Sequence, residues 1–140
     1  MSAFSDLDPF TLFLDDPAVL AVGWIDAQAG YPTGPTDPAA FEKLVELCKA
    51  PWTPLAAAGF HRCRLCQYDG PPMKNEIYIP GRGCIYAAPT GIVHYVAAHR
   101  YQPPPVFIDA VLACPPMRSM DYKRALLANG GRALLKAGRQ

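Results

Sequence analysis

The sequence predicts a small α+β domain, in which one β-hairpin and several short helices surround a metal site. Three observations support this fold class. The chain has 140 residues, the length of one domain, and 51% of them are hydrophobic, enough to form a core. Its 16 prolines and 11 glycines divide the chain into short elements. Two cysteines and two histidines also stand at spacings typical of metal ligands. We therefore expect residues 1–140 to form a single domain.

The N-terminal third predicts one short buried element and one amphipathic helix. Residues 18–25 (AVLAVGWI) are continuously apolar and fit either a buried strand or a short helix. Further on, Asp37 is a typical N-cap and Pro38 a typical first helical residue, which predicts a helix to about Lys49. Its apolar stripe consists of Phe41, Leu44, Val45 and Cys48. Cys48 is therefore expected in the core.

The centre of the chain predicts a β-hairpin. Residues 75–80 (NEIYIP) and 84–88 (CIYAA) have the composition of two short strands. Gly81-Arg82-Gly83 between them is a natural hairpin connection. Because an isolated pair of strands is marginally stable in water, we expect this hairpin to depend on an anchor to the following helix.

The remaining sequence predicts three helices, separated by prolines and glycines. The first begins near Pro89-Thr90 and runs through His99. The second covers residues 106–113, between two proline clusters, and Cys114 after it is expected in the core. The last opens at Ser119 and is interrupted at Asn129-Gly130-Gly131.

The charges give no global argument for a nucleic-acid or membrane partner, because the net charge is +1. Residues 1–37 carry six Asp and no base, whereas residues 118–140 carry six bases and one Asp. Solvated faces, or termini that pair with each other, explain this pattern better than a basic C-terminal segment that binds nucleic acid. No apolar run approaches the roughly 18 residues of a membrane span. The acidic start is unlike a secretory signal, so we expect a cytoplasmic protein.

The strongest functional signal is Cys63-x-x-Cys66 followed by His94 and His99, with 27 residues between Cys66 and His94. Two thiolates and two imidazoles suit a tetrahedral Zn²⁺ ion. The order of a two-cysteine turn, two strands and a helix is that of a ββα zinc unit with an enlarged hairpin, at residues 60–102. We predict Zn²⁺ at these four residues, with His61 and Cys84 as the substitutes.

Helix geometry puts strain on this ligand set. Side chains five residues apart, such as His94 and His99, are separated by about 140° in an ideal α-helix. The sector between them holds Tyr95 and the small residues Gly91 and Ala98, which leaves room for an ion. We expect a tightened last turn to bring His99 nearer to His94.

Four protein ligands favour a closed structural zinc site, because catalytic zinc keeps one position open for water. The sequence contains neither the H-x-E of zinc deaminases nor the H-E-x-x-H of metalloproteases. A redox role of Cys63 and Cys66 would require a helix start in a βαβ setting, which the sequence does not predict. The first hypothesis is therefore a zinc-stabilised binding or adaptor protein for an unidentified protein or small molecule.

Two alternatives stay open. The first is a small zinc-dependent enzyme with the metal as Lewis acid and Glu76 as the carboxylate in the hairpin. The second is a nucleic-acid-binding regulator, which the apolar metal helix with its single base Arg100 makes a poor fit. The group of Tyr78, Tyr86, Tyr101 and residues 103–105 could face a ligand, but we favour ordinary packing.

Three motifs are spread over most of the chain. They are His61-x-Cys63-x-x-Cys66, Pro80-Gly81-x-Gly83-x-x-Tyr86-x-Ala88-Pro89 and His94-Tyr95-x-x-x-His99-x-Tyr101-x-Pro103-Pro104. In this combination the chain resembles an uncharacterised bacterial family of small stand-alone zinc-binding proteins. The resemblance implies a bacterial, cytoplasmic protein of one domain, and it implies no particular activity.

Overall fold

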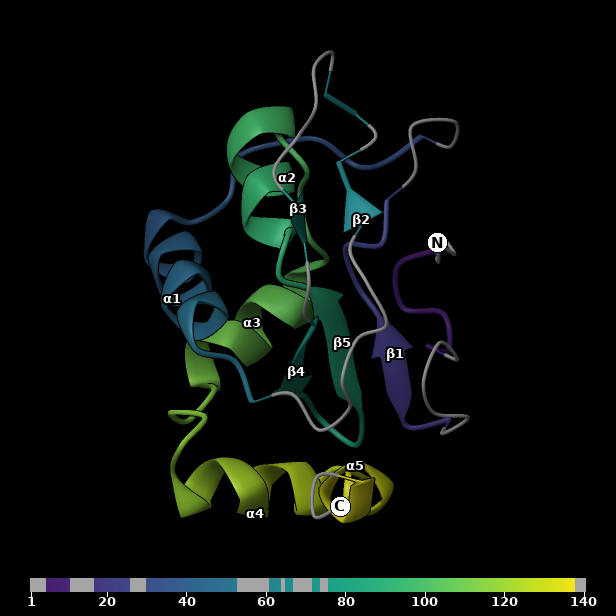
Figure 1. The fold of residues 1–140 in the computed structure, drawn as a ribbon, viewed down its shortest axis with the longest axis vertical. Coiled ribbons are helices and arrows are strands. Elements are labelled where there is room, and N and C mark those ends of the chain that lie inside the picture. Colours follow the sequence, from purple (N-terminus) through teal and green to yellow (C-terminus); the bar gives the residue numbers. More distant parts are fainter. Residues whose placement is uncertain are drawn as a thin grey trace.

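The computed structural model describes residues 5–10, 17–25, 30–52, 61–63, 65–66, 72–73 and 76–137. Its strands are β1 (Val19–Ala21), β2 (His61–Arg62), β3 (Pro72–Met73), β4 (Glu76–Pro80) and β5 (Ile85–Pro89). Its helices are α1 (Pro38–Lys49), α2 (Ile92–His99), α3 (Pro105–Ala113), α4 (Met120–Ala128) and α5 (Arg132–Ala137). The predicted α+β class is confirmed (Figure 1).

A three-stranded sheet in the order β1-β5-β4 lies at the centre of the fold. β4 and β5 form the predicted antiparallel hairpin, with Ile79 opposite Tyr86, and β1 pairs with β5 in parallel. Every residue of β4 and β5 is buried. The premise that this hairpin is an isolated pair of strands is therefore wrong, because β1 pairs with β5 as a third strand. Its dependence on a metal anchor stays a prediction.

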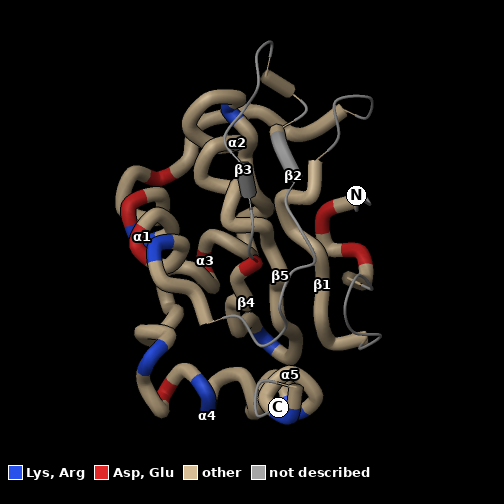
Figure 2. The backbone as a smooth tube through the Cα atoms, in the orientation of Figure 1, with Lys and Arg blue, Asp and Glu red and all other residues tan. Residues whose placement is uncertain are grey.

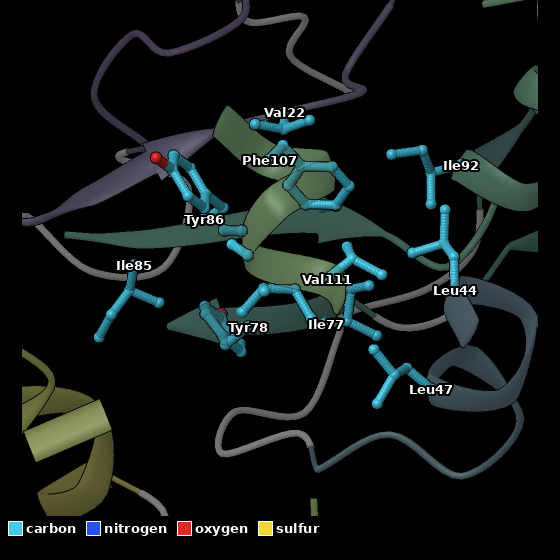
Figure 3. Close-up of a cluster of buried hydrophobic side chains, with 14 of the residues drawn as sticks. Val22, Leu44, Leu47, Ile77, Tyr78, Ile85, Tyr86, Ile92, Phe107 and Val111 are labelled. Atoms are coloured by element: carbon cyan, nitrogen blue, oxygen red, sulfur yellow. The ribbon is translucent and has the colours of Figure 1, made fainter. Parts of the chain in front are cut away.

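Both faces of the sheet are covered, as expected for strands that are apolar throughout. On one face, Phe107 of α3 packs against Tyr86 with ring centroids 5.9 Å apart. Figure 3 shows Phe107 and Val111 of α3 in the same buried cluster as Ile77 and Tyr86. On the other face, the ring of Trp52 meets those of Tyr78 and Tyr122 edge-on, at 6.5 and 5.8 Å.

The helix α1 begins and ends as predicted, because Asp37 accepts a hydrogen bond from Ala39 N–H at 3.1 Å and proline follows it. Its apolar stripe is rotated from the predicted one. The fully buried residues are Ala40, Leu44 and Leu47, whereas Phe41, Val45 and Cys48 are half-buried at the edge of the contact. The reason is that α1 packs against both α2 and α3, which widens the covered face.

The C-terminal helices also follow the prediction. Ser119 caps α4 by accepting a hydrogen bond from Tyr122 N–H at 3.2 Å, and residues 129–131 separate α4 from α5. Figure 2 shows acidic residues on the N-terminal segment and basic residues on α4 and α5. The ion pairs among the described residues are local, Lys49–Glu46 and Arg124–Asp121, so they do not join the two termini. Among the same residues, no helix is long and apolar enough to cross a membrane.

Candidate metal centre

The two cysteines lie in a small unit formed by β2, β3 and the residues Cys63, Leu65 and Cys66, which we term the knuckle. β2 and β3 pair antiparallel over only two residues each, with His61 opposite Met73. Cys63 directly follows β2 and is buried, and Cys66 is half-buried. The sequence did not indicate these strands, because a strand of two residues shows no periodicity and β3 begins with a proline.

The two histidines come from α2, and the end of this helix explains how they converge. Arg100 adopts a left-handed conformation with φ 56°, and its N–H donates to the carbonyl of Tyr95. Tyr101 N–H donates to the same carbonyl at 3.1 Å. The turn is therefore closed over five residues, so the prediction of a tightened last turn is wrong. A five-residue turn places side chains i and i+5 on the same side of a helix, which brings His99 toward His94.

Both imidazoles point Nε2 at the cysteine sulfurs. His94 Nε2 lies 3.1 Å from Cys66 Sγ, and His99 Nε2 lies 3.3 Å from both Cys63 Sγ and Cys66 Sγ. The two rings stand edge to face, with centroids 5.0 Å apart and an angle of 78°. One donor atom from each of the four residues lies within 4.8 Å of every other. Ligands of a tetrahedral Zn²⁺ ion are separated by about 3.3–3.8 Å, so this cage needs only small adjustments.

The electrostatics of the cluster favour a cation at its centre. Burial, with a smaller contribution from His99, lowers the pKa of His94. A lower pKa keeps the imidazole neutral, which is the form that binds metals. Burial and the neighbouring Cys63 raise the pKa of Cys66. A divalent cation between the sulfurs would replace this mutual repulsion of thiolates with attraction.

The other cysteines lie away from this cluster, and none of the five forms a disulfide. Burial raises the pKa of Cys48 to about 12 and that of Cys114 to about 11, in agreement with their predicted packing roles. Cys84 lies in the β4–β5 turn, where its side chain is hydrogen-bonded to Tyr86. Cys84 is therefore not placed to substitute for a ligand. The backbone of His61 is in β2, and its side chain lies outside the described part.

Glu76, the carboxylate named for the enzyme hypothesis, is not part of the described cluster of donor atoms. Its side chain is 2% exposed and accepts a hydrogen bond from the Tyr78 hydroxyl at 3.3 Å. Burial raises the pKa of Glu76 to about 7. The structure thus places this acid in the sheet, together with Tyr78. Tyr78 and Tyr101 are themselves buried, as the packing interpretation predicts.

Fold and site together define a small α+β protein with a Cys₂His₂ cluster able to hold a metal ion. Residues 2–112 match the model of a family described as a domain of unknown function (DUF7919), and the chain belongs to this family. The match includes all four clustered residues and ends before α4. It agrees with the resemblance to an uncharacterised family. No curated protein and no solved structure matches the chain.

Proposed function

We propose that this protein is a zinc-stabilised binding or adaptor protein, with Zn²⁺ in a structural role at Cys63, Cys66, His94 and His99. The observation that carries the proposal is the convergence of four donor atoms, from two separate segments, within 4.8 Å. Two sulfurs and two imidazole nitrogens favour Zn²⁺ over Mg²⁺ or Ca²⁺, which prefer oxygen ligands. Thiolate ligands also fit the reducing cytoplasm expected from the sequence.

A structural role is favoured over a catalytic one by the number and placement of the donors. Four protein ligands complete a tetrahedral shell, whereas catalytic zinc keeps a position for water. The cluster joins the knuckle to α2 across 36 residues, counted from Cys63 to His99. An isolated pair of strands is at best marginally stable in water, and β2 and β3 have only two residues each. The metal would supply the connection that a hydrophobic core supplies elsewhere.

Elemental analysis tests the metal assignment. The full chain, purified without added metal, is expected to contain about one zinc ion per molecule. Cys63→Ser and Cys66→Ser are expected to lose it, whereas Cys48→Ser, a matched control outside the cluster, is expected to keep it. Cobalt(II) in place of zinc should give the intense visible absorption of a tetrahedral thiolate site. A metal-free chain with an ordered knuckle would refute the proposal.

The enzyme alternative predicts a different result for the histidine variants. If the metal is a Lewis acid, one of His94→Ala and His99→Ala should retain zinc on three protein ligands. Chelation should then abolish a turnover without changing the melting temperature.

The nucleic-acid alternative has little support from the surface of α2. The exposed residues at its C-terminal end are Ala97, Ala98 and Arg100, which provide a single cation. Tight binding to a DNA duplex, with a steep dependence on salt concentration, would favour this alternative over the proposal.

A further inference from the structure

The end of the sheet opposite the Cys₂His₂ cluster carries a pocket. This pocket of about 350 Å³ is formed between the β4–β5 turn and α3, and we term it the turn pocket. Its lining includes Arg82 and Tyr86 from the hairpin, and Val106, Asp109 and Ala110 from α3. Strand β5, about 16 Å long, separates this turn from α2 (Figure 1). The volume is within the range of small-molecule sites.

The turn that carries Arg82 is held in one conformation from both sides. Gly81 N–H donates to the carbonyl of Cys84 at 2.9 Å. Gly83, with φ 71°, donates its N–H to Asn129 Oδ1 at 2.8 Å. Asn129 is in turn fixed by a hydrogen bond from its Nδ2 to the carbonyl of Ala125, at 2.7 Å. Preorganisation of this kind reduces the entropy cost of binding a ligand.

The floor of the pocket explains the first glycine of the Pro-Gly-x-Gly-x-x-Tyr motif. No residue of this motif is in the Cys₂His₂ cluster. A Cβ atom on Gly81 would lie 2.6 Å from the ring of Tyr86, so only glycine lets the turn lie over this ring. Tyr86 is 6% exposed, and its ring packs against that of Phe107. The motif therefore builds a rigid, largely apolar floor beneath Arg82.

The two rims of the pocket carry opposite charges. Arg82 is exposed on the turn, and Asp109 is exposed on α3. Figure 2 shows the basic segment at the β4–β5 turn and the acidic segment on α3. The ion pairs among the described residues involve neither of these side chains. On the α3 side of the pocket, Val106 is 48% exposed, and Ala110 is one helical turn away from it on the same face of α3.

We propose that the turn pocket binds a small zwitterion of amino-acid or dipeptide size with an aliphatic side chain. The ligand carboxylate pairs with Arg82, its ammonium group pairs with Asp109, and its side chain covers Val106 and Ala110. A ligand with only an anion would be repelled by Asp109, and one with only a cation would be repelled by Arg82. This inference rests on the proposed role as a binding protein, but not on the identity of the metal.

Titration of ¹⁵N-labelled, metal-loaded protein with L-leucyl-L-leucine tests the proposal by NMR. Saturable shifts are expected at the amides of Gly81, Gly83 and Ala110. N-acetyl-L-leucine and L-leucinamide each lack one charge and should bind at least about tenfold more weakly, the equivalent of one lost charged pair. Arg82→Gln and Asp109→Asn should each weaken the binding of the dipeptide by a similar factor. Arg132→Gln, on α5, is the matched control and should bind as the wild type does.

Three outcomes would overturn the inference. The first is the absence of shifts at the turn up to the solubility limit of the dipeptide. The second is equal binding of the capped analogues, which would leave only an apolar contact. The third is tighter binding of N-acetyl-L-leucine by Asp109→Asn than of the dipeptide by the wild type, which would make this an anion site. Zinc content, measured in the same samples, reports on the proposed metal role independently.

Discussion

The central sheet and the knuckle are two small β structures in one chain, and we propose that they are stabilised by different means. β4 and β5 bury every residue, between α3 on one face and the aromatic cluster around Trp52 on the other. β2 and β3 have two residues each, and two of the four clustered donors, Cys63 and Cys66, come within four residues of the end of β2. Burial is non-directional and shared among many atoms, whereas ligation depends on four particular atoms. The sheet should therefore tolerate conservative substitutions, whereas the knuckle should lose its ordered structure when one of the four donors is removed.

The separation of these two regions has a functional consequence. The Cys₂His₂ cluster brings the knuckle and α2 together at one end of β5, and the turn pocket lies at the other end. The sheet between them is stabilised by its own core. Loss of the metal should therefore disorder one end of the molecule and leave the other competent for binding.

Metal removal should give the largest effect, because it acts on the knuckle and leaves the core of the sheet intact. Structural zinc sites contribute about 10–16 kcal/mol of apparent binding energy in peptides, and a pair of two-residue strands is at best marginally stable on its own. With chelator, the backbone amides of β2 and β3 should lose protection from hydrogen exchange by about 100-fold or more. The amides of β4 and β5 should change by less than about tenfold. Hydrogen exchange resolved by residue measures both regions at once.

Cys63→Ser should reproduce the effect of the chelator without any additive, and Cys48→Ser should not. Equal loss of protection in both regions would show that the sheet also depends on the metal, as the sequence first suggested.

Truncation in the sheet should give the next largest effect and a global one. Ile77 is fully buried between the strands and α3, so Ile77→Ala should lower the free energy of unfolding by about 2–5 kcal/mol. The folded fraction should still bind one metal ion. Leu127→Ala, at a side chain 56% exposed on α4, should change stability by no more than about 0.5 kcal/mol. Urea unfolding measures both variants, and equal losses would contradict the assignment of the core.

Much of this fold follows from local sequence signals. Asp37 with Pro38, and Ser119, mark helix starts that the structure confirms, because capping depends on residues adjacent in the chain. The hairpin follows from two apolar runs around Gly81 and Gly83. The four clustered residues were identified because thiol and imidazole pairs at short spacings have few other common uses.

The features that the sequence did not reveal depend on contacts between distant segments. The pairing of β1 with β5 joins residues about 66 apart, Val19 with Ile85, and no local pattern indicates it. The wide turn at the end of α2 forms because the N–H groups of Arg100 and Tyr101 both donate to the carbonyl of Tyr95. The turn pocket requires α3 beside the hairpin, so Arg82 and Asp109 carry no joint signal in the sequence.

The two regions should also respond to pH in opposite directions, and Glu76 provides the test. Its pKa is raised from 4.5 to about 7 in the folded protein by burial. The stability contributed by the protonated acid is therefore complete below pH 4.5 and is lost as the pH rises through about 7. Glu76→Gln should stabilise the protein at pH 8 by up to roughly 2–3 kcal/mol, and by almost nothing at pH 4.

Ligation has the opposite sign, because protonated thiols and imidazoles release metal as the pH falls. Measuring the difference in urea unfolding between Glu76→Gln and the wild type at each pH cancels this metal effect. An equal difference at pH 4 and pH 8 would show that the carboxyl group does not titrate in this range.

The smallest predicted effect concerns α4, which lies beyond the residues matched to the family. It tests whether α4 unfolds together with the sheet. The buried Tyr122 hydroxyl donates a hydrogen bond to the Tyr78 carbonyl of β4. Tyr122→Phe removes this donor and should cost about 1 kcal/mol of unfolding free energy. Tyr31→Phe is the matched control, because its half-buried hydroxyl donates to the His99 carbonyl of α2 at 3.2 Å and should cost no more than about 0.5 kcal/mol. If α4 and the sheet unfold together, Tyr122→Phe shifts a single transition monitored by both hydrogen exchange and tryptophan fluorescence. An early transition confined to α4 and α5 would instead make these helices a separate, weaker addition to the sheet.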